Sequence, residues 1–311
     1  MKIKHQRLPI IIFIFAFLLM SFSFLPVVWG FWAHKQIHRL AINRLENVMP
    51  ASAFNFFRKH EKFLIEHAVD PDDRRRIDPT EGPQHYIDLD RFGKFPFPDL
   101  PVRWEDAKQK YGEDSLRANG LVPWRISNFT DSLTLAFQKK DLERILFFAA
   151  NVGHYVADCN VPLHATENYD GQLTGQNGIH GRWESEYPER FMRHYEARPL
   201  PDSLLQYTSF KEIENITEES MKWARESFLL CSPVLKGDLA AQKGLSGDSL
   251  KKIVTGREGR KREIYSPFYY EHFKGEMNGM VESRFEISAE RVAMIWFTAW
   301  VRAGKPDLSN L

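Results

Sequence analysis

The stretch FFAANVGHYVADCNVPLHA, residues 147–165, sets the fold and the chemistry that we expect of this chain. It has the character of one helix, and His154 and Asp158, four residues apart, would project from one face of it. Pro162 ends this helix, because its ring lacks an N–H group and restricts the residue before it. The chain can then turn and bring His164 back toward the same face. Three side chains that bind metals therefore fall within eleven residues.

A second pair with the same spacing follows this stretch. His180 and Glu184 are again four residues apart, and the five side chains together have the spacing H-x3-D-x5-H-x15-H-x3-E. Imidazole and carboxylate without thiolate suit zinc, and a catalytic zinc usually takes three ligands from the protein. Five ligands therefore predict at least two metals, with Asp158 able to bridge them. The alternative is a set of unrelated surface side chains on amphipathic helices.

Helical periodicity dominates the sequence after residue 28, and convincing alternating strands are few. Helices are expected over residues 33–49, 50–68, 104–118, 122–138, 141–159, 182–195, 214–230 and 284–303. Residues 70–102 form a long irregular segment of the kind that is often functional. Residues 165–181 are a Gly- and Asn-rich loop, and residues 232–270 have no clear pattern. We therefore expect one all-α domain over residues 29–311, with long functional loops.

Residues 1–28 have the pattern of a secretory signal peptide. Lys2, Lys4 and Arg7 precede an apolar run that continues to Val28. The alternative is an uncleaved membrane anchor, because an apolar run of about 20 residues is long enough to span a bilayer. Cleavage after Val28 would deliver the rest of the chain to the periplasm or the exterior of the cell.

The charge balance excludes a broad basic surface for nucleic acid. Without residues 1–28 the chain carries 39 basic and 41 acidic side chains, so its net charge is slightly negative. Local basic patches remain possible at Arg74–Arg76 and at residues 257–262. Solvated loops are the simpler interpretation of both.

Two further motifs complete a pattern that is known from one enzyme superfamily. WGFWAH, from Trp29 to His34, follows the apolar run, and HAVDPDD…PQHYIDLD places Asp70 fifteen residues before His85. With these motifs the chain resembles the zinc-dependent phospholipases C and their relatives, the single-strand-specific nucleases. The matching positions, in order, are Trp29, His34, Asp70, His85, His154, Asp158, His164, His180 and Glu184. The resemblance covers most of the chain after residue 28.

The resemblance implies an all-α fold that holds three zinc ions. The ligands of the first zinc would be Asp70, His85, His154 and Asp158. Those of the second would be His164, His180 and Glu184, and those of the third Trp29, His34 and Asp158. Trp29 would bind through its free amine, whose reference pKa of about 8 lets zinc displace the proton, so the chain must be cut between Val28 and Trp29. Asp70 would in addition act as a base for the attacking water.

The resemblance also implies hydrolysis of a phosphate ester, because zinc provides a water-derived nucleophile at neutral pH. Glu184 as the last ligand favours the phospholipase C branch, since the nucleases usually have aspartate there. Tyr86 and Asp88 match a position at which the nucleases bind a base, and Arg74 lies in a loop between two ligands, where it could bind an anion. We therefore expect a secreted, phospholipase C-like zinc phosphodiesterase. The alternative is a single-strand-specific nuclease or 3′-nucleotidase of the same fold.

The partners follow from these two alternatives. The substrate would be a phospholipid head group or a single-stranded nucleic acid, with transient contact to a membrane surface in the first case. The sequence indicates no protein partner. A hypothesis from another class is a non-catalytic, zinc-stabilised binding protein that keeps its N-terminal anchor; it requires that Trp29 is not the N-terminus and that no zinc-dependent hydrolysis occurs.

Overall fold

The computed structural model describes residues 30–196, 210–255 and 261–311, with the side chains of Lys261 and Arg262 left out. Within these residues the secondary structure is helical apart from one two-stranded hairpin. The expected all-α fold is confirmed. The predicted signal peptide and Trp29 lie outside the described residues.

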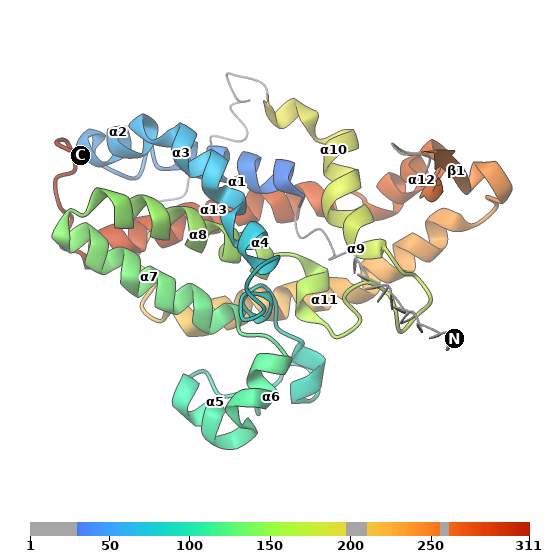
Figure 1. The fold of residues 1–311 in the computed structure, drawn as a ribbon, viewed down its shortest axis with the longest axis horizontal. Helices are drawn as coiled ribbons and strands as arrows, with labels where there is room; N and C mark the ends of the chain where they lie inside the picture. The colour runs from blue at the N-terminus through green and yellow to red at the C-terminus, as the bar shows by residue number, and fades with distance from the viewer. Residues whose placement is uncertain (1–29, 197–209, 256–260) are drawn as a thin grey trace, which may run out of the picture.

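Five helices make up the body of the molecule (Figure 1). They are α1 (Phe31–Arg44), α7 (Val122–Lys139), α8 (Leu142–Cys159), α11 (Ile216–Gln242) and α13 (Met280–Arg302). Helix α8 is central, because it packs against α7, α11 and α13, and α1 lies along α13. The metal-binding residues expected on α8 therefore lie inside the helical body and not on its surface.

The sequence determines where α8 begins and ends. Asp141 is its N-cap residue, and its carboxylate accepts a hydrogen bond from the backbone N–H of Arg144 at 3.2 Å. Lys140 adopts a left-handed conformation with φ 52°, which reverses the chain between α7 and α8. At the other end Pro162 begins a short 3-10 turn, Pro162–Ala165, as the sequence predicts. The turn returns the chain toward the helix that it has just left.

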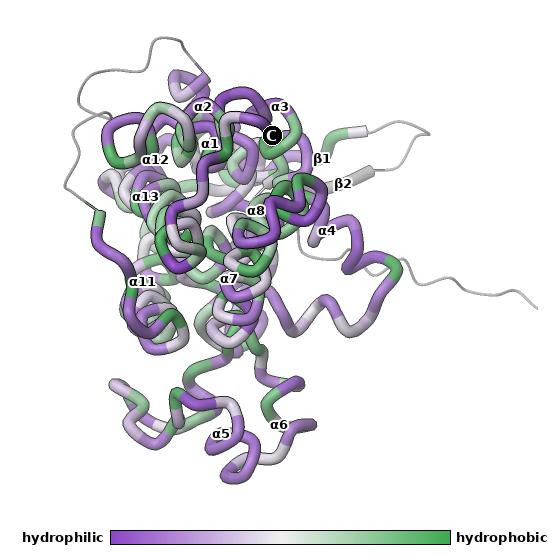
Figure 2. Tube along the Cα trace, turned by 90° about the vertical axis from the view of Figure 1, so that its left-hand side faces the viewer, coloured by the Kyte–Doolittle hydropathy of each residue, from purple (hydrophilic) through white to green (hydrophobic). Residues whose placement is uncertain are grey.

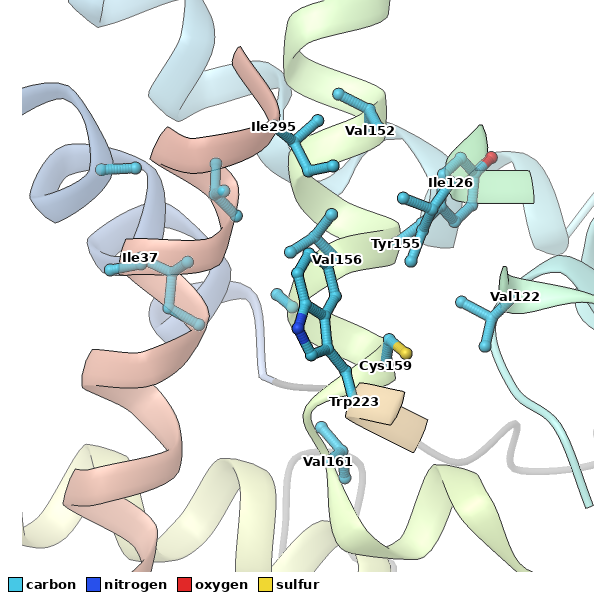
Figure 3. Packing of buried hydrophobic residues seen from close by; sticks show 14 of the residues in the cluster. Ile37, Val122, Ile126, Val152, Tyr155, Val156, Cys159, Val161, Trp223 and Ile295 are labelled. Carbon is cyan, nitrogen blue, oxygen red and sulfur yellow. The ribbon is translucent and has the colours of Figure 1, made fainter. Parts of the chain in front are cut away.

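The core forms around both sides of α8. Val152 and Val156 of α8, Trp223 of α11 and Ile295 of α13 belong to one buried cluster (Figure 3). Full burial of a side chain such as valine or isoleucine contributes about 1.5–3 kcal/mol. Because the same helix also carries His154 and Asp158, this packing fixes the rotation and position of two candidate ligands.

Shorter elements connect and flank these helices. They are α2 (Ala51–Lys59), α3 (Glu61–Glu66), α4 (Asp70–Arg75), α5 (Trp104–Tyr111), α6 (Glu113–Ala118), α9 (Ile179–Gly181), α10 (Tyr187–Phe191) and α12 (Pro267–Met277). Helices α5 and α6 form a lobe that projects from the body and is mostly hydrophilic (Figures 1 and 2). The single helix expected over 104–118 is interrupted at Gly112, whose φ of 79° is a conformation that favours glycine.

Residues 232–270 are more regular than their sequence indicates. Helix α11 continues through Pro233, which is exposed, so that the carbonyl left without a helical partner can bond to water. The antiparallel strands β1 (Lys251–Thr255) and β2 (Lys261–Tyr265) follow, with Lys251 paired to Tyr265 and Thr255 to Lys261. None of the described helices is long and apolar enough to cross a membrane.

Candidate metal centre

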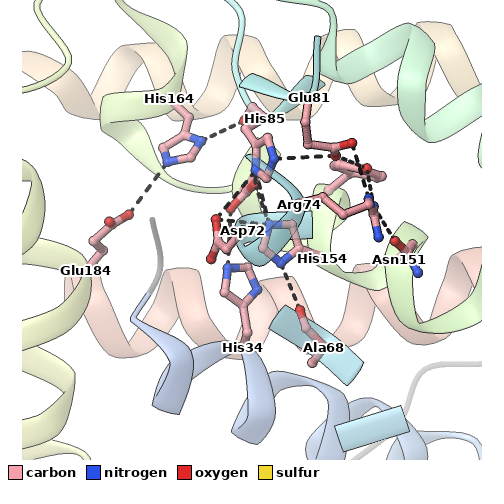
Figure 4. Close-up of polar contacts among 12 residues, drawn as sticks. His34, Ala68, Asp72, Arg74, Glu81, His85, Asn151, His154, His164 and Glu184 are labelled. Atoms are coloured by element: carbon pink, nitrogen blue, oxygen red, sulfur yellow. Dashed lines mark hydrogen bonds and ion pairs between the residues drawn. The ribbon is translucent and has the colours of Figure 1, made fainter. Parts of the chain in front are cut away.

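Eight buried side chains from seven parts of the chain converge beside α8. They are His34 of α1, Asp72 of α4, His85 after a 3-10 turn, His154 and Asp158 of α8, His164 of the turn after Pro162, His180 of α9 and Glu184 of the π-helical turn Arg182–Glu186. Figure 4 labels six of them, His34, Asp72, His85, His154, His164 and Glu184, and shows that their side chains point toward a common region. Seven of them are among the positions that the sequence predicts.

Around α8 the side chains form two overlapping groups, each with ligand atoms within 4.8 Å of one another. His154 belongs to both groups, one with His34 and Asp72 and the other with His85 and Asp158. The Asp158 carboxylate lies 2.8 Å from His85 Nδ1, 3.1 Å from His154 Nε2 and 3.4 Å from His34 Nε2. This carboxylate therefore contacts both groups, as a bridging ligand would.

His164, His180 and Glu184 form the third group. Nε2 of His180 lies 3.1 Å from Nε2 of His164 and 3.0 Å from Glu184 Oε2. Burial raises the pKa of Glu184 well above its usual range and lowers the pKa of His180 to about 4. Without a cation, burial thus opposes charge on both side chains.

The orientation of the imidazoles fits a bound cation. Nδ1 of His154, His164 and His180 faces a backbone carbonyl, at 2.8, 2.7 and 3.1 Å respectively, and must carry the proton to donate it. In its neutral form each imidazole then presents the lone pair of its Nε2 to the centre. The two lone pairs of His164 and His180, 3.1 Å apart, cannot hydrogen-bond to each other. A metal ion would satisfy both.

The carboxylates support the same conclusion. Both oxygens of Asp72, both of Glu184 and Oδ1 of Asp158 are buried and form no hydrogen bond within the described structure. Unpaired buried carboxylate oxygens are costly unless a cation accompanies them. Nitrogen and oxygen donors without thiolate fit zinc. The residues present thus fit the metal that the sequence predicts.

The placement of Asp70 requires a correction. Asp70 is the first residue of α4, its side chain is 36 % exposed, and its carboxylate lies 2.8 Å from His67 Nδ1. Asp72 is the residue of this helix that reaches the centre, 3.8 Å from His154 Nε2 and 3.9 Å from His85 Nδ1. Two residues rotate the helix by roughly 200°, so the two side chains point in nearly opposite directions. The run DPDD contains both aspartates, and the count of fifteen residues before His85 favoured Asp70, which the structure places away from the centre.

Arg74 also lies elsewhere than the sequence prediction places it. Its guanidinium donates to Asn151 Oδ1 at 2.5 Å and to the Tyr155 hydroxyl at 3.1 Å, behind the centre and away from the pocket. The neighbouring Arg75 lines the pocket instead. A cationic side chain therefore does line a pocket beside the centre, one residue later in the chain than expected.

Tyr86 and Asp88 line a small pocket that opens onto the centre. The pocket has a volume of about 140 Å³ and is lined by Arg75, His85, Tyr86, Asp88, Leu163, His164, Tyr169 and His180. Burial, together with the nearby charges of Asp90 and Glu167, raises the pKa of Asp88 to about 7. The sequence did not single out Tyr169, which lies in the Gly- and Asn-rich loop.

The beginning of α1 is held against the third group. The backbone N–H of Gly30 donates to the carbonyl of Glu184 at 3.2 Å. A Cβ added at Gly30 would lie 2.8 Å from Ser185 Oγ, so the two segments are in close contact. The described chain therefore starts beside the centre, at the residue that follows Trp29.

Comparison with known proteins now identifies the family. The S1/P1 nuclease family matches residues 29–255, which is most of the chain. This chain belongs to the S1/P1 nuclease family. The nuclease side of the resemblance seen in the sequence is thereby confirmed, and the clusters of buried histidine and carboxylate are of a kind that can hold metal ions.

More distant similarities exist as well. A probable serine protease of Bradyrhizobium tropiciagri is 23% identical over 230 residues, which are 65% of this chain and 27% of the relative. Among solved structures, the alpha-toxin of a Clostridium perfringens avian strain has 12% identity and a TM-score of 0.49, with 88% of this chain and 65% of the toxin covered. The alpha-toxin of Clostridium absonum has 13% identity and a TM-score of 0.48, with 86% and 63% covered. The chain thus spans about a quarter of the first relative and just under two thirds of each toxin.

Proposed function

We propose that this chain is a zinc-dependent phosphodiesterase that cleaves single-stranded nucleic acid and removes 3′-phosphate from nucleotides. The observation that carries the proposal is the pocket of Tyr86, Asp88 and Tyr169 beside three candidate ligands. Two phenol rings and one carboxyl group at the mouth of a small pocket suit a flat ring with polar edges. Membership of the S1/P1 nuclease family supports the same substrate class.

Each side chain has a role in this reaction. Zinc, when bound, would supply a water-derived nucleophile at neutral pH and offset the charge of the phosphate. Arg75 would hold the phosphate through its guanidinium, whose planar fork matches phosphate oxygens. Tyr86 and Tyr169 would stack on the base, and Asp88 would hydrogen-bond to the edge of that base. The hydrogen bonds of His154, His164 and His180 to backbone carbonyls orient these imidazoles, which would hold the metal through Nε2.

The phospholipase C alternative, which the sequence favours through Glu184, stays a prediction. Its substrate needs a place for a head group and, beside it, for a lipid surface. The pocket of about 140 Å³ has room for one small group. We therefore favour the nuclease over the phospholipase C, and an assay on both kinds of substrate distinguishes the two activities.

The decisive assay offers several phosphate esters to the zinc-loaded protein. We expect cleavage of a single-stranded oligonucleotide and release of phosphate from a nucleoside 3′-monophosphate, both abolished by a chelator and restored by zinc. Duplex DNA and phosphatidylcholine vesicles serve as the competing substrates. A His154→Ala preparation, purified in the same way, controls for contaminating nuclease. Hydrolysis of the vesicles with no cleavage of the oligonucleotide would overturn the proposal in favour of the phospholipase.

The titration of Asp88 predicts a dependence of base preference on pH. Since its pKa is raised to about 7, the group is a hydrogen-bond donor below that pH and a carboxylate acceptor above it. The ratio of kcat/KM for substrates with amino-bearing bases to that for uracil or thymine should rise as the pH increases through about 7. Because both substrates are cleaved at the same metal centre, the effect of pH on that centre cancels in the ratio. In Asp88→Asn it should be flat, and a flat ratio in the wild type would contradict this role for Asp88.

We further propose that the protein is exported and cut between Val28 and Trp29, so that the new amine joins the centre. The pattern of residues 1–28 and the contact of Gly30 with Glu184 support this proposal. N-terminal sequencing of the secreted protein should return Trp29. A variant with one alanine inserted before Trp29 should bind one zinc fewer per chain, as counted by elemental analysis. An uncut chain that binds three zinc ions would contradict this prediction.

A further inference from the structure

Three imidazoles of the centre are held through their second nitrogen. Nδ1 of His154, His164 and His180 faces a backbone carbonyl, at 2.8, 2.7 and 3.1 Å. His85 is oriented the opposite way, because its Nδ1 faces Asp158 Oδ2 at 2.8 Å and its Nε2 points out of the centre (Figure 4). A different kind of partner must therefore define the orientation of His85.

The carboxylate of Glu81 lies where His85 Nε2 points. Its Oε1 is 3.6 Å from that nitrogen, which is buried and forms no hydrogen bond in the described structure. A separation of 3.6 Å is a close polar contact, although it is longer than a hydrogen bond. Glu81 is 3 % exposed, so little water competes for the nitrogen. Glu81 is thus the acceptor that a proton on Nε2 faces.

Several donors hold the Glu81 carboxylate in this position. Arg74 Nε and Arg125 Nη2 each lie 3.4 Å from its Oε2, and the Tyr155 hydroxyl donates to its Oε1. Arg74 is in turn fixed by Asn151 Oδ1 at 2.5 Å. Two guanidinium groups keep the carboxylate ionised, and the network keeps it from turning away.

We propose that Glu81 is a positioning residue of the metal centre. It keeps the proton of His85 on Nε2 and thereby directs the lone pair of Nδ1 at the metal group around Asp158. A carboxylate behind a histidine ligand orients the ring and increases its basicity, and its loss typically costs roughly 10–100-fold in metal affinity. The inference rests on the proposed zinc centre but not on the identity of the substrate.

Glu81→Gln tests this role, since glutamine keeps the shape and removes the charge. Its amide can also turn its NH₂ group toward Nε2 and favour the wrong tautomer. Zinc affinity is measured by titrating the metal-free full-length secreted protein with zinc in competition with a coloured chelator. We expect one zinc to bind roughly 10–100-fold more weakly than in the wild type. The absorption spectrum of the cobalt-substituted protein should change as well, because the ligand field at His85 changes.

Asp238→Asn is the matched control. Asp238 is also a fully buried carboxylate with an arginine and a tyrosine partner, since Arg182 Nη2 lies 3.0 Å from it and the Tyr269 hydroxyl donates to it. It lies outside the three ligand groups. This variant should lose thermal stability and keep wild-type zinc affinity. The inference is overturned if Glu81→Gln binds every zinc with wild-type affinity, or if both variants lose zinc equally.

If Glu81→Gln does not fold, a measurement on the wild type tests the same role of Glu81. In zinc-loaded protein labelled with ¹⁵N-histidine, the His85 signal, assigned by its loss in His85→Gln, should show a proton on Nε2 and none on Nδ1. The opposite tautomer would overturn the role of Glu81. Protein that binds zinc in this way but cleaves no nucleic acid would contradict the proposed function alone.

Discussion

Asp158→Asn is expected to lose bound zinc and hydrolytic activity together. The carboxylate lies 2.8 Å from His85, 3.1 Å from His154 and 3.4 Å from His34, so it contacts the two groups of ligands around α8. Asparagine has almost the same shape but no charge, and it offers one acceptor oxygen in place of two. We expect kcat/KM to fall by roughly a hundredfold or more, since the loss of an outer partner of a ligand alone costs 10–100-fold.

Zinc per chain, measured by elemental analysis after dialysis, should fall in this variant alongside the cleavage of a single-stranded oligonucleotide. Asp238→Asn again provides the comparison, because it removes a buried carboxylate that belongs to none of the ligand groups. A melting curve shows whether each variant is folded. If Asp158→Asn retained all of its zinc, a bridging role for Asp158 would be wrong.

The ligands that share a helix were predictable from the sequence. The spacing of His154 and Asp158 places them on one face of any α-helix, and the structure does bring them within 3.1 Å of each other. His180 and Glu184 have the same spacing and are also brought together, at 3.0 Å. In both cases local geometry decides the contact, so a short window of sequence contains the necessary information.

The choice between Asp70 and Asp72 was not decided by local geometry. Both lie in the first turn of α4, and the rotation of that short helix against the rest of the molecule determines which side chain points inward. The same rotation separates Arg74, which bonds to Asn151, from Arg75, which lines the pocket. Distances counted along the chain cannot report such a rotation, because it results from packing between segments that are far apart in sequence.

The roles of side chains behind the centre could not be predicted from the sequence, for a related reason. Glu81 contacts His85 within one short segment, but its other partners, Arg125 and Tyr155, come from α7 and α8. Nothing in the letters TEGPQH distinguishes this glutamate from an exposed one in a loop. The all-α fold was predictable because its periodicity is strong, whereas the hairpin of β1 and β2 is too short to give a clear alternating pattern.

Asp72→Asn and Asp70→Asn are expected to differ strongly, although the two residues are almost adjacent. Both carboxylate oxygens of Asp72 are buried and unpaired, and burial raises the pKa of this group, so its charge is compatible with the site only beside cations. Asp72→Asn should therefore bind at least one zinc more weakly and lose roughly a hundredfold or more in kcat/KM. Asp70 is 36 % exposed and paired with His67, a contact worth at most about 1 kcal/mol.

Asp70→Asn should accordingly stay within a few-fold of the wild type in both zinc content and kcat/KM, and it serves as the matched control for Asp72→Asn. The two proteins are prepared and assayed side by side at several zinc concentrations, because a weakened site can refill when zinc is in excess. Recovery of Asp72→Asn at high zinc would identify Asp72 as a ligand that serves affinity more than chemistry. If Asp70→Asn were the inactive variant, the spacing of fifteen residues before His85 would be right, and the rotation of α4 seen in this structure would be wrong.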